Sequence, residues 1–183
     1  MTSRWRRSWG HLGWIRVFAG VVLVLGAVTY LNIVSHERGL ASNRTSAHLQ
    51  SLGLLLHEES ALQWKALADR SAPIRVAREV GTIRGREKEI LALLDDVLPD
   101  ATNRELSNLI TEYHAVLDQE LGLLVVGLTK EAAELEWAET DPKFKELSER
   151  IASLSADAVA QARSAKATAD NILIAAMVFT AVV

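Results

Sequence analysis

Two groups of residues in this chain have side chains that could do chemistry on a metal ion or a substrate. His57-Glu58-Glu59 resembles part of a helical zinc motif, in which imidazole and carboxylate groups hold and assist the metal. No second histidine follows at the spacing that this motif requires. His114 and Asp118 are four residues apart and share a helix face, where a solvent-facing polar pair is a better interpretation than catalysis. We therefore predict no catalytic residue, no metal site and no cofactor.

A third group, Arg70, Arg75 and Arg78, could bind a ligand instead of reacting with one. Guanidinium groups hold carboxylates through paired hydrogen bonds, so the candidate ligand is a small anion. The competing interpretation is that these arginines neutralise nearby acids: Glu131, Glu134, Glu136, Glu139 and Asp141. Those acids lie around the predicted third turn, at the same end of the molecule, and exposed ion pairs contribute only ~0–1 kcal/mol each. We favour pairing and keep the three arginines as candidate ligand-binding residues.

An enzyme is not expected from the rest of the sequence. It contains no phosphate-binding glycine loop and no nucleophile elbow. It also contains no cysteine, which excludes a disulfide framework, a thiolate nucleophile and a cysteine-ligated metal. The fold must therefore be held together by packing alone.

The elements that would position these side chains are helices. Apolar residues recur at spacings of three and four through the middle of the chain, and Pro73, Pro99 and Pro142 divide that stretch into four pieces. The predicted helices are 35–72, 74–98, 102–138 and 141–172. Thr102 and Glu105 match a capping box, and Asp141-Pro142 matches a helix start. Short turns between amphipathic helices predict an all-α fold, an antiparallel up-down-up-down four-helix bundle.

Two apolar runs flank the predicted bundle, and both are predicted transmembrane helices. Val17–Val34 is 18 uncharged residues, longer than the core of a typical signal peptide, so we favour an uncleaved anchor. Ile172–Val183 is the start of a second such run. We expect a cytoplasmic segment at 1–16, a span at 17–34, an extracytoplasmic bundle at 35–170 and the start of a second span at 171–183.

Charge sets the predicted orientation in the membrane. Residues 1–16 carry four arginines and no acid, whereas the rest of the chain holds 16 basic and 23 acidic residues. Basic residues beside a span stay on the cytoplasmic side, so we expect the N-terminus inside the bacterial inner membrane and the acidic bundle outside. The arginines could also contact nucleic acid. Their position against an apolar run favours topology, and we expect the lipid bilayer, not nucleic acid, as a partner.

In this order of elements the chain resembles the input half of methyl-accepting chemotaxis receptors, a module that also fronts diguanylate cyclases and sensor histidine kinases. The stretch Leu56–Ala68 (LHEESALQWKALA) is similar to bundle sensors attached to diguanylate cyclases. The resemblance covers nearly the whole chain and is one of architecture. It implies a homodimeric sensory input module that relays an extracytoplasmic stimulus, a small anionic ligand or a periplasmic binding protein, to a cytoplasmic output domain beyond Val183.

A second function class remains open from the sequence. The chain could be a structural or accessory membrane protein whose helical bundle binds a protein partner. Sequence beyond Val183 would separate the two classes, because an output domain there would support the sensory one.

Overall fold

The structure of this protein is a computed structural model. It describes the backbone of residues 5–69 and 72–182, and the side chains of residues 22, 25–69 and 72–178. Over these residues every regular element is a helix and there is no strand, which confirms the predicted all-α class. The elements are α1 (Trp5–Ala68), α2 (Pro73–Asp95), α3 (Asp100–Val125), α4 (Thr129–Leu135), the π-helical turn η1 (Glu136–Thr140) and α5 (Asp141–Val182).

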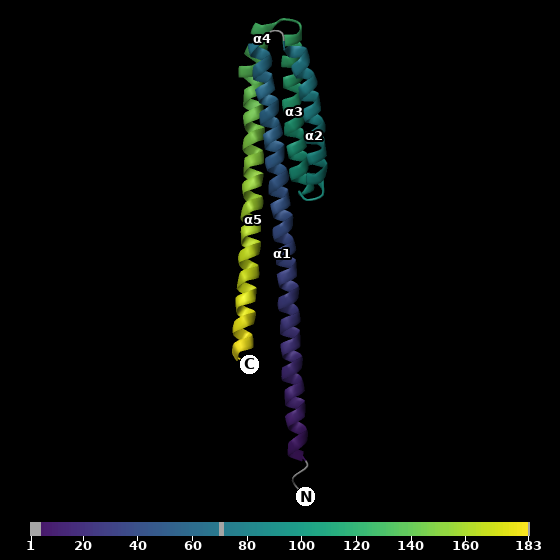
Figure 1. Cartoon of the computed structure of the whole chain (residues 1–183), viewed down its shortest axis with the longest axis vertical. Helices are drawn as coiled ribbons and strands as arrows, with labels where there is room; N and C mark the ends of the chain where they lie inside the picture. The colour runs from purple at the N-terminus through teal and green to yellow at the C-terminus, as the bar shows by residue number, and fades with distance from the viewer. Residues whose placement is uncertain (1–4, 70–71, 183) are drawn as a thin grey trace. The chain divides into compact units, whose positions relative to one another are not determined.

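The chain divides into two compact units, and residues 41–160 form the larger one. Its helices are antiparallel neighbours, because residue numbers that rise along one helix fall along the helix it contacts. Ser46 on α1 meets Ser155 on α5, and Trp64 on α1 meets Trp137 on η1, just before α5. Between α2 and α3, Arg84 meets Asp118 and Asp95 meets Asn103. Figure 1 shows α2 and α3, joined by a short turn, beside the α1 and α5 segments of this unit. The unit is therefore an antiparallel four-helix bundle.

The core of the bundle follows a heptad-like pattern on each helix. Every helix of the unit contributes fully or nearly fully buried apolar side chains, among them Leu49, Leu52 and Leu56 on α1, Val76 and Val80 on α2, Ile110, Tyr113 and Leu117 on α3, and Leu147 and Ile151 on α5. Spacings that alternate between three and four residues keep one stripe of each helix turned inward. Hydrophobic burial along these stripes is the main force that holds a cysteine-free domain together.

The third turn lies elsewhere than the sequence predicts. Helix α3 ends at Val125, and the chain reverses at Gly127, whose φ of 84° lies in the left-handed region that glycine adopts at little cost. Helix α5 begins at Asp141, as predicted, but no turn precedes Pro142. It follows η1, in which the Asp141 N–H donates to the Glu136 carbonyl five residues back. A proline lacks the N–H of the ordinary i→i−4 bond, and this wider π turn accommodates it inside a continuing helix.

The predicted capping box is also wrong. Helix α3 begins at Asp100 after Pro99, and no side chain caps it. Helix α2 starts at Pro73, where the missing proline N–H costs nothing because the first N–H groups of a helix have no intrahelical partner. Helix α1 ends at Ala68, a few residues before the predicted end at Ala72.

The smaller unit comprises residues 5–40 of α1 and 161–182 of α5. Gly39 marks a close approach of the two helices, because a Cβ there would lie 3.8 Å from that of Ala165. Large apolar side chains on both helices are exposed: Val22, Leu25, Tyr30, Leu31, Ile33, Leu173, Ile174, Met177 and Val178.

Among the residues whose side chains are described, no helix has the length and apolar character needed to cross a membrane. The two predicted spans lie partly outside that set, since the side chains of residues 17–21, 23, 24 and 179–183 are not among those described.

Candidate functional site

A layer of polar side chains replaces apolar ones in the bundle core. Glu59 and Gln63 continue the stripe of Leu52 and Leu56 on α1, and Glu87 takes a core position on α2. Glu120 on α3 and Glu136 on η1 do the same. All five side chains are at most 2% exposed. We call these five residues the buried polar layer. Burying ionisable groups is costly unless each finds a partner, so their arrangement indicates what the layer does.

Three side chains from three helices converge at one end of this layer. The Nε2 atom of His114 on α3 lies 3.3 Å from Glu59 Oε2 and 3.1 Å from Glu87 Oε2. One donor atom from each residue lies within 4.8 Å of the other two. We call Glu59, Glu87 and His114 the His114 cluster. Two carboxylates and an imidazole at these distances are a set of groups that can hold a proton or a cation.

Arg84 on α2 fixes one carboxylate of the His114 cluster from the outside. Its Nε donates to Glu59 Oε1 at 2.9 Å, and its Nη1 donates to both carboxylate oxygens of Asp118, at 2.8 and 3.0 Å. Its Nη2 also donates to the His114 carbonyl at 3.4 Å. Arg84 therefore ties the orientation of Glu59 to the backbone of the helix that carries His114.

The protonation of His114 is set by its surroundings. Burial by itself lowers the pKa of the imidazole, but the adjacent Glu59 and Glu87 carboxylates outweigh that effect and raise the pKa to about 9. A charged imidazole then neutralises part of the negative charge that the two buried carboxylates bring into the core.

Glu120 and Glu136 form a second group, at the other end of the layer. The Gln63 side-chain amide donates to Glu120 Oε2 at 2.7 Å and also to Glu136 Oε2. Burial and the neighbouring Glu136 raise the pKa of Glu120 to about 8, and burial likewise raises the pKa of Glu136. Two buried carboxylates with a neutral shared donor favour holding at least one proton between them.

The negative charges of the His114 cluster and of the Glu120–Glu136 group both act on Tyr113. Its ring is fully buried and packs against Phe144, with centroids 5.9 Å apart. Burial, and then the charges of Glu59, Glu87, Glu136 and Glu120, raise the pKa of its phenol. The phenol therefore stays neutral, and its hydroxyl is a buried donor beside four carboxylates.

The structure does not gather the predicted arginines into one ligand site among the residues described. Arg70 lies outside the described residues. Arg75 is exposed and lies 4.0 Å from Glu79 on the same helix, and Arg78 is also exposed. The acids expected to neutralise them are placed differently, because Glu134 pairs with Lys130 and Glu136 is in the core. Whether Arg75 and Arg78 bind an anion stays a prediction.

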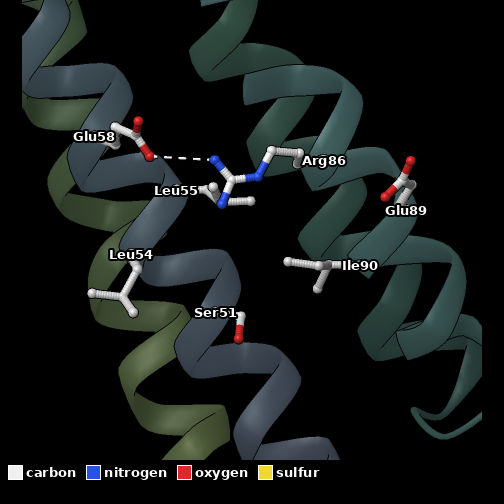
Figure 2. Close-up of a pocket in the computed structure, with 7 residues that line it drawn as sticks. All are labelled: Ser51, Leu54, Leu55, Glu58, Arg86, Glu89 and Ile90. Atoms are coloured by element: carbon white, nitrogen blue, oxygen red, sulfur yellow. Dashed lines mark ion pairs between the residues drawn. The ribbon is translucent and has the colours of Figure 1, made fainter. Parts of the chain in front are cut away.

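A shallow groove between α1 and α2 is a weaker candidate. Figure 2 shows its lining, with Glu58 and Arg86 pointing toward one another across it and Leu54, Leu55 and Ile90 along it. The Glu58–Arg86 pair is 3.6 Å apart, and both side chains are more than half exposed. Exposed pairs of this kind contribute little energy and little specificity.

The sequence contains a signal for the buried polar layer that residue types alone did not reveal. On α1 the buried stripe runs through positions 49, 52, 56, 59, 63 and 66, so Glu59 and Gln63 stand at heptad core positions. Glu87 and Glu120 interrupt apolar heptads in the same way. The sequence predicts that His114 and Asp118 form a solvent-facing pair. The Asp118 side chain is 60% exposed, whereas the His114 side chain is only 19% exposed and turns inward.

Comparison with known proteins assigns neither a family nor a function to this chain. The chain matches no protein-family model, and no curated protein or solved structure is significantly similar to it. Arguments about its function therefore depend on its own residues.

Proposed function

We propose that this chain is the membrane-anchored sensory input module of a bacterial signal-transduction receptor. In this proposal residues 17–34 and the run from Ile172 are the membrane segments, and the bundle is extracytoplasmic. The bundle relays a stimulus to a cytoplasmic output domain, of the diguanylate cyclase or chemotaxis type, and functions as a homodimer.

One observation carries the membrane part of this proposal. Outside the bundle, α1 and α5 both expose large apolar side chains, such as Tyr30 and Ile33 on one helix and Met177 and Val178 on the other, at 53–68% exposure. Apolar surface of this extent is covered in a working protein by a partner or by lipid. Four arginines immediately precede the first apolar run, which is the charge arrangement of a cytoplasmic anchor.

The buried polar layer supports the sensory part. A core of ionisable groups is often less stable than an apolar core of the same shape, and in this proposal that lower stability lets a second packing of the bundle lie close in energy. A coupling of about 1–3 kcal/mol between two packings is enough to bias an output. Helices α1 and α5 carry both the core residues and the apolar runs, so a shift in one helix reaches both.

The experiment that tests this function uses a covalent lock between α1 and α5. The Ser46 and Ser155 hydroxyl oxygens lie 3.1 Å apart, close enough for cysteines at both positions to form a disulfide. Residues 1–183 contain no natural cysteine, so no other thiol of this chain interferes. Residues 1–183 of the Ser46→Cys/Ser155→Cys variant are fused to a cytoplasmic diguanylate cyclase, and cyclase activity is measured in membranes.

We expect oxidation to change cyclase activity in the double variant and reduction to restore it. The Ser46→Cys single variant is the matched control and is expected to be insensitive to both treatments. Equal activity in the locked and reduced double variant, with the disulfide verified on a gel, would contradict relay through α1 and α5.

The accessory-protein alternative is favoured by a different observation. Trp64 and Trp137 pack edge to face with ring centroids 6.0 Å apart, and they are 44% and 68% exposed. Exposed tryptophans are frequent anchors at protein interfaces. If the alternative holds, Trp137→Ala will abolish co-purification of a partner while the lock has no effect on a fused cyclase.

A further inference from the structure

We propose that the His114 cluster is a binding site for a single divalent transition-metal ion, ligated by Glu59, Glu87 and His114. This site is independent of the proposed sensory role, because it follows from the bundle core alone.

The first argument is the spacing of the donor atoms. Ligands about 2.0–2.1 Å from a zinc ion at tetrahedral angles lie roughly 3.3–3.4 Å from one another. His114 Nε2 lies 3.3 Å from Glu59 Oε2 and 3.1 Å from Glu87 Oε2. The three side chains come from α1, α2 and α3, so the packing of the bundle holds the imidazole at that spacing from both carboxylates, and all three donor atoms lie within 4.8 Å of one another.

The second argument is that these atoms converge without hydrogen-bonding one another. Glu87 is 1% exposed, and neither of its carboxylate oxygens has a hydrogen-bond partner among the described residues. The same is true of Glu59 Oε2 and His114 Nε2. A protonated His114 has one N–H at Nε2 to offer to two carboxylates, so at least one buried carboxylate oxygen lacks a full hydrogen bond, whereas a cation between the three donor atoms would satisfy all of them.

The third argument is the support around the cluster. Arg84 donates to Glu59 Oε1 at 2.9 Å and leaves Glu59 Oε2 turned toward His114. Groups that orient a ligand from behind in this way are a regular part of protein metal sites. Arg84 is a positioning residue here, since it contacts no metal.

The donor set narrows the class of ion. One imidazole and two carboxylates suit Zn²⁺, Mn²⁺ or Fe²⁺, whereas Mg²⁺ and Ca²⁺ prefer oxygen ligands alone. Dinuclear carboxylate sites in helical bundles use two histidines. The cluster contains only His114, so it fits one ion, with solvent or a further ligand completing the coordination.

Zinc binding to purified residues 1–183 in detergent tests the proposal. The protein is treated with chelator and dialysed against Zn²⁺ at rising concentration with Mg²⁺ in excess, and bound zinc is counted by mass spectrometry. We expect one zinc per chain. Glu87→Gln and His114→Gln should each weaken zinc binding at least about tenfold.

Two matched control variants remove a carboxylate and an imidazole next to the cluster but outside it. Glu58→Gln and His57→Gln lie on exposed positions of α1 beside the cluster, and both should bind zinc like the natural chain. Helical circular dichroism verifies that each variant is folded. Since Glu87→Gln keeps the volume of the side chain, it remains informative if His114→Gln does not fold.

Pulsed electron paramagnetic resonance of the Mn²⁺-loaded chain identifies the ligand directly. A histidine nitrogen coupling should be present in the natural chain and in His57→Gln and absent from His114→Gln. The proposal is overturned if the natural chain binds no stoichiometric zinc, or if Glu87→Gln and the natural chain bind it equally.

Discussion

Glu120 on α3 and Glu136 on η1 share a single hydrogen-bond donor, the side-chain amide of Gln63 on α1. Three separate elements thus bring two carboxylates together in a fully buried position. A charged amine would neutralise both acids, but a neutral amide does not. The pair therefore retains a proton at pH values where exposed glutamates are ionised.

This pair predicts a specific pH dependence of stability. The pKa of Glu120 rises from an ordinary 4.5 to about 8 in the folded protein. Between these values the folded state holds a proton that the unfolded state has released, so stability falls as pH rises from about 4.5 to about 8. Glu120→Gln removes this contribution, and the variant should gain stability relative to the natural sequence as pH rises through that window.

Urea unfolding of residues 41–160 at several pH values, followed by circular dichroism, measures the effect. The matched control is Glu112→Gln on the same helix, an exposed residue 2.8 Å from Lys143, which should keep the natural pH profile. The groups that face Glu120 are Thr140, Glu136, Gln63 and Tyr113, and none of these is changed in either variant. Parallel pH profiles for Glu120→Gln and the natural sequence would refute the shared proton.

Arg84 and Arg86 offer a second comparison, because each pairs with a neighbouring glutamate on α1. Arg84→Gln leaves the fully buried Glu59 carboxylate without its charged donor and should lower the free energy of unfolding by roughly 3 kcal/mol. Arg86→Gln breaks a pair in which both side chains are more than half exposed, and should cost only ~0–1 kcal/mol. Urea unfolding of the two variants measures both losses in the free energy of unfolding. Equal losses would show that Arg84 does not stabilise the buried Glu59 carboxylate.

A glycine in the third turn and a glycine inside a helix should respond oppositely to substitution by alanine. Gly127 has a φ of 84°, so Gly127→Ala should destabilise the bundle by about 1–2 kcal/mol. Gly81 lies within α2, where an added Cβ would meet nothing within 4 Å, so Gly81→Ala should stabilise by about 0.5–1 kcal/mol. Thermal unfolding of both variants tests this prediction, which fails if Gly127→Ala is neutral.

Membrane orientation can be measured with alkaline phosphatase, which is active only outside the cytoplasm. A fusion after Asp141 would interrupt a continuing helical segment. Fusions after Ala72, in the turn between α1 and α2, and after Leu128, in the turn that follows α3, are better placed and should both be active in a bacterial host. Inactive enzyme at both points, with normal expression, would reverse the proposed orientation.

The sequence by itself determined the helical class, the first two turns and most of the apolar core. These features depend on local properties: the spacing of Leu106, Ile110 and Leu117 within one helix, and the restriction that Pro73 and Pro99 impose on their own neighbours. The third proline broke the rule, because Pro142 is accommodated by the wider hydrogen bond of η1. Only the backbone of the folded chain decided that the turn falls at Gly127.

Tertiary structure alone decided how the polar residues are grouped. Glu59, Glu87 and His114 are separated by many residues in the sequence, and they meet because α1, α2 and α3 pack in one particular register. Sequence periodicity shows that Glu59 and Glu87 occupy core positions, yet it cannot show which core positions lie at the same height. That height is fixed by where each turn reverses the chain, which is a property of the packed bundle and not of any single helix.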